Sequence, residues 1–241
     1  MKAESDRFPR YLPFGDNALL VEFGNKISLE ANLKVVALAE AIEIARIQVE
    51  ELVPTYRSLL IRYDPQKTTY TEVAHEVQNV EKTMKKTPQT KERRKIIIPT
   101  VYGGEFGSDL PYVAQYHGLS EEQVVKLHSE KEYRVYMIGF VAGFPYLGEV
   151  ADEIATPRLE TPRLKVPAGS VGIAEKQTGI YPCVAPGGWQ IIGRTPLRLF
   201  NPSWQPPTLL ETGDVVSFKP ISAGEFKDLE GKSVTNALSG K

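Results

Sequence analysis

Two stretches in the first third of the chain repeat apolar residues with the period of an α-helix. Across residues 29–44, apolar side chains recur at steps of three and four, and Ser28 precedes them as a residue type that accepts an orphan backbone N–H. A second apolar stripe runs through residues 70–84. At its start, Thr69 and Glu72 have the spacing of a capping box. We therefore predict two helices, each with one face packed against a sheet.

The segments around these helices favour β-strands. Residues 11–24 alternate apolar side chains around the turn-forming residues 15–17, which is typical of a β-hairpin. Two further strands are predicted at residues 48–53 and 57–63. The first part of the chain is therefore expected to form a small α+β unit with a largely antiparallel sheet.

A polar segment, residues 85–95, separates this region from the rest of the chain. It contains Pro88 and marks the expected boundary between two domains, residues 1–88 and 89–241. Glycine and proline gather beyond Gly103, between short apolar runs. Strands are predicted there at residues 95–100, 133–138, 165–173, 182–184, 188–193, 197–200 and 214–218. Many short strands with turns between them are typical of a closed barrel or a sandwich.

Two short helices are predicted near the start of this second domain. The first lies within residues 107–118, with Ser108 or Asp109 as its cap and Gly118 as its terminator. The second follows Ser120, which has capping-box spacing to the glutamine three residues later, and ends near His128. The whole chain is thus assigned to the α+β class.

Composition excludes several classes of function. The formal net charge is −1, which leaves no surplus of Lys and Arg for binding nucleic acid. Cys183 is the sole cysteine, so an intrachain disulfide and a thiolate metal cage are excluded, and the three histidines lack ligand spacing. No segment approaches the roughly 18 apolar residues of a membrane helix, and the N-terminal residues do not resemble a signal peptide. We predict a cytoplasmic protein with no metal site and no membrane or nucleic-acid partner.

Candidate chemistry concentrates between Gly139 and Thr195. The chain has neither a GxxxxGK[ST] phosphate loop nor a GxSxG nucleophile elbow. This window instead combines glycines, which permit close backbone approach, with aromatic residues that supply apolar walls. Pro-Arg occurs twice, at residues 157–158 and 162–163, and a guanidinium on stiff backbone suits a carboxylate.

Each of these features also has a purely structural explanation. Glycine pairs let strands bend at barrel corners. Arg158 and Arg163 would equally form surface ion pairs with acidic residues between positions 152 and 160. Trp189 would serve as a core anchor, and His128 closes a helix, where its charge favours the helix dipole. The sequence leaves both explanations open.

Several motifs, in this order, closely resemble the allophanate hydrolase subunit 1 family. They are GFVAGFPYLG, the doubled TPRL, VPAGSVGIA, TGIYP and APGGWQIIGRTP, and the earlier LPFGDNALLVEFG and RSLLIRYDP match as well. The resemblance therefore covers nearly the whole chain. It implies a small N-terminal α+β domain and a C-terminal cyclophilin-like β-barrel. One position departs from the family pattern, because Ala142 stands where a proline is usual.

The resemblance also implies an activity and partners. Family members form one component of an ATP-dependent 5-oxoprolinase, beside a KipA-like component of the allophanate hydrolase subunit 2 family and a component of the LamB/YcsF family. Others, KipI-like, inhibit autophosphorylation of a sporulation histidine kinase, and related modules occur within urea carboxylases. We expect one component of a multi-subunit enzyme, with a site that partners complete and that uses ATP. The alternatives are kinase inhibition, or a module related to allophanate hydrolase and urea carboxylase.

The resemblance and the chemistry of the window together give a set of candidate residues. Arg163 and Arg194 would hold a substrate carboxylate or a phosphate, and His128 would move a proton. The pocket for substrate or partner is expected to comprise Gly139, Phe140, Gly143, Phe144, Tyr146, Gly169, Ser170, Gly187, Gly188, Trp189, Gln190 and Thr195.

Overall fold

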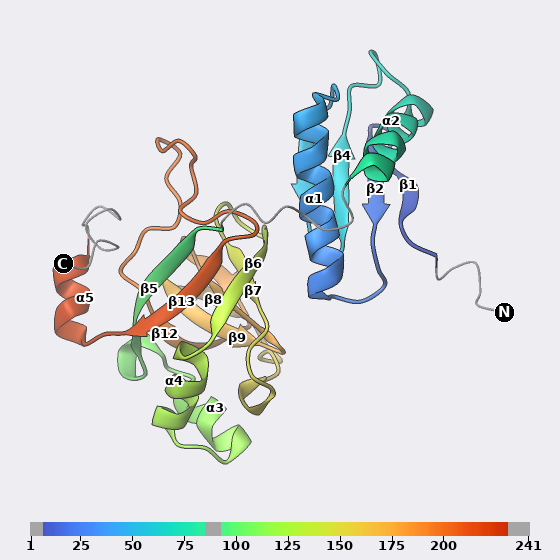
Figure 1. The fold of residues 1–241 in the computed structure, drawn as a ribbon. Helices are drawn as coiled ribbons and strands as arrows, with labels where there is room; N and C mark the ends of the chain where they lie inside the picture. The colour runs from blue at the N-terminus through green and yellow to red at the C-terminus, as the bar shows by residue number, and fades with distance from the viewer. Residues whose placement is uncertain (1–6, 85–92, 231–241) are drawn as a thin grey trace. The chain divides into compact units, whose positions relative to one another are not determined.

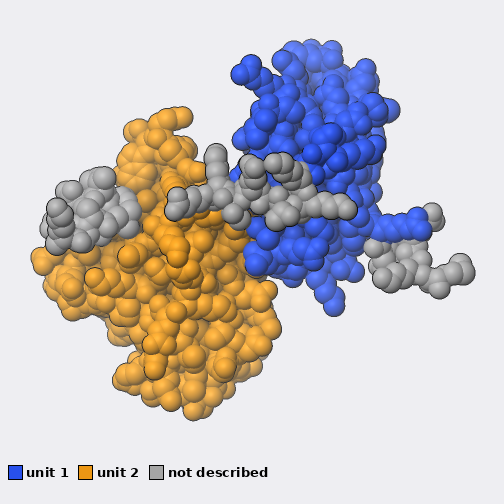
Figure 2. All heavy atoms as spheres, in the orientation of Figure 1, with its two compact units in different colours: residues 1–92 blue, residues 93–241 orange. Residues whose placement is uncertain are grey.

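The structure, a computed structural model, describes residues 7–84 and 93–230 (Figure 1). The chain divides into two compact units, residues 1–92 and 93–241, which Figure 2 distinguishes by colour. The predicted boundary after residue 88 falls outside the described residues. Within the described ranges, no helix is long and apolar enough to cross a bilayer.

Unit 1 is a four-stranded antiparallel sheet with two helices. The strand order is β1-β2-β4-β3. The elements are β1 (Arg10–Phe14), β2 (Ala18–Glu22), α1 (Leu29–Ala45), β3 (Glu51–Pro54), β4 (Ser58–Arg62) and α2 (Tyr70–Thr83). Alternate side chains of the two central strands, among them Leu19 and Ile61, pack with the apolar stripes of both helices. Both helices and the hairpin therefore form where the sequence pattern predicts them.

The caps of these helices are also as predicted. The Ser28 hydroxyl accepts a hydrogen bond from the Ala31 backbone N–H at 3.1 Å. Thr69 and Glu72 form a reciprocal capping box at the start of α2. Local sequence therefore determines both helix starts.

Unit 2 is a closed seven-stranded barrel with the strand order β10-β7-β6-β13-β5-β12-β9. Its elements are β5 (Lys95–Tyr102), η2 (Gly104–Phe106), α3 (Leu110–His117), α4 (Glu121–Ser129), β6 (Glu132–Ile138), β7 (Pro145–Gly148), η3 (Asp152–Ile154), β8 (Arg163–Val166), β9 (Ser170–Ala174), β10 (Gln177–Ile180), β11 (Ala185–Gly187), β12 (Gln190–Arg194), β13 (Val215–Pro220) and α5 (Ala223–Leu229). Strands β5 and β13 are parallel, and the other barrel pairs are antiparallel. The α+β class with a barrel in the second unit is therefore confirmed.

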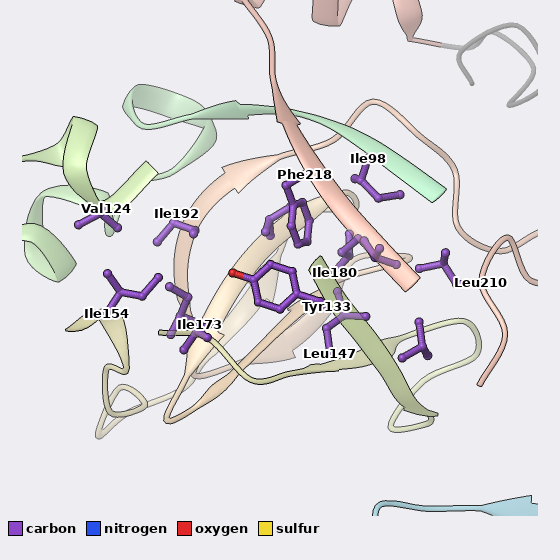
Figure 3. Packing of buried hydrophobic residues seen from close by; sticks show 14 of the residues in the cluster. Ile98, Val124, Tyr133, Leu147, Ile154, Ile173, Ile180, Ile192, Leu210 and Phe218 are labelled. Atoms are coloured by element: carbon purple, nitrogen blue, oxygen red, sulfur yellow. The ribbon is translucent and has the colours of Figure 1, made fainter. Parts of the chain in front are cut away.

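Side chains from all sides fill the barrel interior. Tyr133, Phe218 and Ile180 lie close together at its centre (Figure 3). Helices α3 and α4 lie at one end of the barrel (Figure 1), where Val113 and Val124 join the same core. The barrel interior is thus a packed core.

Three predicted strands need correction. The predicted strand 165–173 is two strands, β8 and β9, because Pro167 and Gly169 form a turn between them, with Gly169 at φ +81°. Residues 182–184 form a bend. Residues 197–200 contain no strand, only an isolated bridge at Phe200.

Short elements account for most of the omissions. Strands β7 and β10 each have four residues and contain glycine, so neither shows a clear alternation. Helix α5 has seven residues and begins with a capping box of Ser222 and Glu225 that the sequence already displays.

The caps in unit 2 follow prediction with one exception. Gly118 ends α3 at φ +66°, and Ser120 with Gln123 forms the capping box of α4. Asp109 occupies the N-cap position of α3, but its side chain makes no capping hydrogen bond there. Its carboxylate is instead engaged with β8 and β12.

Candidate functional site

A second apolar cluster lies on the outer face of the barrel wall. Side chains alternate along a strand, so Ile192 of β12 joins the interior core while Ile191 faces outward. The outward-facing side chains pack under the two-stranded β8–β11 ribbon through Val166 and Ala185. This arrangement creates an exposed cavity beside the ribbon and outside the barrel.

The cavity encloses about 290 Å³. Its walls come from the β6–β7 loop, β7, the segment before β8, the end of β10 and the β11–β12 connection. They comprise Phe140, Phe144, Tyr146, Arg158, Leu159, Pro162, Tyr181, Pro186, Gly187, Gly188 and Trp189. Six of these were predicted as pocket residues: Phe140, Phe144, Tyr146, Gly187, Gly188 and Trp189.

Aromatic rings dominate the cavity wall. The Phe144 ring centroid lies 4.9 Å from that of Tyr146, 5.1 Å from that of Tyr181 and 5.4 Å from that of Trp189. Phe140 lies 5.7 Å from Phe144 in an edge-on arrangement, and its residue surface is 57% exposed. The cavity therefore has a rigid apolar base and one exposed aromatic residue.

Two consecutive turns place Phe140 in this position. The Val141 N–H donates to the Gly139 carbonyl at 2.8 Å, which closes a γ-turn around Phe140 at φ +65°. The Phe144 N–H then donates to the Val141 carbonyl at 3.1 Å, with Gly143 at φ +83°, as in a type II turn. A positive φ costs free energy in a phenylalanine, and such strain concentrates at functional sites.

Ala142→Pro is expected to raise the free energy of unfolding of unit 2 by about 0.4–1 kcal/mol. Ala142 occupies the second position of the type II turn, where proline fits, and its side chain is exposed. Urea unfolding followed by tryptophan fluorescence measures this effect selectively, because both tryptophans, Trp189 and Trp204, belong to unit 2.

The control for this substitution is Val141→Pro, which removes the N–H that donates to Gly139. It is expected to destabilise unit 2. Destabilisation by both prolines would contradict the assignment of the turn.

Two tyrosines, Tyr146 and Tyr181, contribute to the cavity wall. Burial raises the pKa values of Tyr146 and Tyr181, while a hydrogen bond from the Trp189 backbone acts against that rise at Tyr181. Both hydroxyls are therefore protonated at neutral pH. A Cβ atom at Gly187 would lie 2.0 Å from the Tyr181 hydroxyl oxygen, so this position requires glycine.

Arg158 is the arginine that lines the cavity, and it is the first of the two Pro-Arg positions. Its guanidinium carbon lies 5.9 Å from the Trp189 ring centroid, within the range of a cation–π contact. The residue is exposed, and it forms no ion pair with any other residue that the structure describes. Its charge is therefore available to a ligand.

Arg163, the second Pro-Arg position, does not line the cavity. Its guanidinium binds the Asp109 carboxylate at 2.5 Å and the Trp189 carbonyl at 3.3 Å. The other Asp109 oxygen accepts the Ile191 N–H at 2.6 Å. The ion-pair explanation therefore applies to Arg163, with an acid that is remote in sequence.

Arg194 lies at a junction between β9 and β12. Its Nε donates to the Ala168 carbonyl at 2.8 Å, and the Thr195 N–H donates to the Gly169 carbonyl at 2.9 Å. A Cβ atom at Gly169 would lie 2.3 Å from the Thr195 carbonyl oxygen, and Ser170 is 1% exposed. These four residues, Arg194, Thr195, Gly169 and Ser170, close the barrel and do not reach the cavity.

Three further predicted residues support the cavity without lining it. Gly139 and Gly143 shape the β6–β7 loop, and a Cβ atom at Gly143 would lie 2.8 Å from Phe200. Gln190 is 2% exposed, and its Nε2 donates to the Pro157 carbonyl at 2.9 Å.

His128 lies inside the barrel, fully buried and away from the cavity. The Thr178 hydroxyl donates to the Gly172 carbonyl at 3.0 Å, so its oxygen accepts from His128 Nε2 at 2.9 Å. Nδ1 then accepts from the Tyr102 hydroxyl at 2.8 Å. Burial lowers the pKa of His128 to about 3, which keeps the ring neutral.

The described ranges, 7–84 and 93–230, hold no cluster of three or more His, Cys, Asp or Glu side chains that suits a metal ion. Cys183 is an exposed free thiol.

Residues 9–210 match a family model described as the carboxyltransferase domain, subdomain C and D. The chain belongs to this family. Among curated relatives, the B subunit of the 5-oxoprolinase of Bacillus subtilis is 42% identical over 223 residues, covering 88% of this chain and 92% of the relative. The resemblance drawn from the motifs is therefore confirmed. The kinase-inhibitor alternative gains no support from this relative's name.

Solved structures of the family show the same fold. A conserved uncharacterized protein from Pyrococcus horikoshii is 52% identical, with a TM-score of 0.55 over 90% of this chain and 100% of that one. The protein TTHA0988 is 37% identical, with a TM-score of 0.76 over 86% of this chain. The chain corresponds to 40% of the TTHA0988 chain, so other members combine this module with further sequence.

Proposed function

We propose that the chain is the B subunit of an ATP-dependent 5-oxoprolinase, which cleaves 5-oxo-L-proline to L-glutamate. The observation that carries this proposal is the match to the corresponding Bacillus subtilis protein over nearly the full length of both chains. The exposed cavity with its free arginine supports it, because the substrate is a small ring that bears a carboxylate.

The reaction explains the need for ATP. The lactam amide is a poor electrophile, and transfer of the ATP γ-phosphoryl group to its oxygen activates the ring carbon and releases ADP. One water adds to this carbon, and the ring nitrogen leaves as the amine. A second water hydrolyses the resulting acyl phosphate to glutamate and phosphate. Stabilisation of the charges along this path is the main task of the protein groups.

This chain contributes the site for the substrate carboxylate. The Arg158 guanidinium offers paired N–H donors to both carboxylate oxygens, and the rings of Phe144 and Trp189 form walls for the apolar ring atoms. His128 cannot exchange protons with a ligand there, because it is enclosed by the barrel. Proton transfer is therefore assigned to the partner proteins.

The partners are proposed to be a KipA-like protein of the allophanate hydrolase subunit 2 family and a protein of the LamB/YcsF family, and the complex binds the ATP. The chain has no GxxxxGK[ST] loop that would hold the nucleotide by itself. Phe140, which is exposed beside the cavity, offers apolar surface for a partner to cover. No contact among the described residues favours binding of a histidine kinase.

The test reconstitutes the chain with both partner proteins and measures ATP-dependent release of glutamate. We expect no activity from the lone chain and activity from the assembly. Arg158→Ala is expected to raise KM for 5-oxoproline about 10- to 100-fold, the loss of one charged hydrogen-bonding group. Lys165→Ala, an exposed cation on β8, is the matched control and leaves KM unchanged.

Two results would contradict the proposal in different ways. Glutamate release by the lone chain would exclude a shared site. An active assembly in which Arg158→Ala has the KM of the unsubstituted protein would remove Arg158 and this cavity from substrate binding.

A further inference from the structure

The backbone on both sides of Arg158 is hydrogen-bonded to the start of β12 and to the β11–β12 connection. The carbonyl of Pro157 accepts from Gln190 Nε2 at 2.9 Å, and the N–H of Leu159 donates to the Gly188 carbonyl at 2.7 Å. Arg158, the residue between them, lies over Trp189, the residue between Gly188 and Gln190. This pairing fixes the orientation of the peptide units on both sides of Arg158.

One of these two contacts comes from a side chain that is costly to bury. Gln190 is 2% exposed, and its Oε1 has no hydrogen-bond partner among the described residues. A buried carbonyl without a donor loses its hydration and gains nothing in return. An apolar side chain of similar length would fill the same space without this penalty. Stability alone therefore does not explain a glutamine at this position.

We infer that Gln190 is a positioning residue, which fixes the Pro157–Arg158 peptide so that the Arg158 guanidinium is presented over Trp189 to an anionic ligand in the cavity. The identity of that ligand rests on the proposed function, whereas the positioning itself does not. Thr156 supports the same segment from its other side, through a hydroxyl that donates to the Ile154 carbonyl at 3.0 Å and contacts His117 at 3.1 Å. Hydrogen bonds of Thr156 and Gln190 thus hold the segment around Arg158 at both ends, next to η3 and to β12.

Gln190→Leu is expected to weaken ligand binding without lowering the stability of unit 2. Loss of the contact to Pro157 should leave the urea midpoint of unit 2 unchanged or higher, because the unpaired Oε1 is removed with it. The same substitution should loosen residues 157–159 and misplace the Arg158 guanidinium. A small misplacement of a binding group lowers affinity, and we expect KM to rise about fivefold at unchanged kcat.

The experiment compares the full chain with Gln190→Leu and with Gln115→Leu, an exposed glutamine of α3 that serves as the matched control. Urea unfolding by tryptophan fluorescence gives stability, and backbone 15N relaxation gives the mobility of Arg158 and Leu159. KM for 5-oxoproline is measured in the complex with both partner proteins. In an Arg158→Ala background, Gln190→Leu should change KM less than about twofold, because its effect acts through Arg158.

The outcomes separate the inference from the proposed function. Unchanged relaxation at Arg158 and Leu159 in Gln190→Leu, or a lower urea midpoint with unchanged KM, would overturn the inference and assign Gln190 a structural role. A complex that never cleaves 5-oxoproline, even without substitutions, would overturn the proposed function alone. The relaxation data would then still decide whether Gln190 positions Arg158.

Discussion

Asp109→Ala is expected to lower the free energy of unfolding of unit 2 by about 3–5 kcal/mol, the cost of removing one partner from a largely buried ion pair. The Asp109 side chain is 11% exposed and receives both the Arg163 guanidinium and the Ile191 N–H. Its loss would leave the Arg163 guanidinium without its charged partner and the buried Ile191 N–H without an acceptor. Urea unfolding monitored by tryptophan fluorescence measures the effect.

The control for this prediction is Asp152→Ala. Asp152 pairs with Lys176 on the surface, with a side chain 76% exposed, and its removal is expected to change stability little. The double variant Asp109→Ala with Arg163→Leu should recover part of the loss, because no uncompensated guanidinium remains. Equal effects of Asp109→Ala and Asp152→Ala would contradict the view that the buried pair stabilises unit 2 more than a surface pair does.

Local sequence does not predict which of the two Pro-Arg positions provides the arginine of the cavity. Arg158 and Arg163 have identical local sequences, TPRL in both cases, so no local signal distinguishes them. Their surroundings differ because Asp109, 54 residues before Arg163 in the chain, meets only that arginine. The anion was assigned to Arg163 from the sequence, whereas the folded chain pairs Arg163 with Asp109 and places Arg158 at the cavity.

Features with local causes were predicted well. Capping residues such as Ser28 and Thr69 accept from N–H groups two or three positions away. The local sequence therefore contains all the information needed to predict these helix starts. Short barrel strands lack such a signal, because their hydrogen bonds go to partners that only the closed barrel supplies. Strand β13, for example, pairs in parallel with β5, which lies more than 100 residues earlier.

The sequence also did not predict the positive φ of Phe140. The sequence indicated a glycine-rich loop with aromatic walls, and in the structure the aromatic residues of this loop gather at one cavity. A positive φ at a phenylalanine, however, depends on hydrogen bonds of the following turn. The local pattern therefore predicts the composition of the cavity better than its geometry.

Acid is expected to destabilise unit 2 through His128, by about 2 kcal/mol between pH 7 and pH 5. The pKa of His128 is about 3 in the folded chain, whereas an unfolded histidine titrates near 6.5. Below pH 6.5 the unfolded state gains a proton that the folded state does not accept. The stabilising contribution is therefore complete above pH 6.5 and falls by up to about 1.4 kcal/mol per pH unit until the pH approaches 3.

His128→Gln tests this prediction, because a glutamine amide can still donate to Thr178 but does not titrate. The variant should be less stable at pH 7, since it leaves the Tyr102 hydroxyl without its acceptor, but its stability should depend less on pH. The difference between the two proteins should therefore shrink by about 2 kcal/mol from pH 7 to pH 5. His75→Gln, on the exposed side of α2 in unit 1, should retain the pH dependence of the tryptophan signal, which arises in unit 2. Parallel pH profiles for the unsubstituted chain and His128→Gln would show that the enclosed ring takes up its proton as readily as an exposed one.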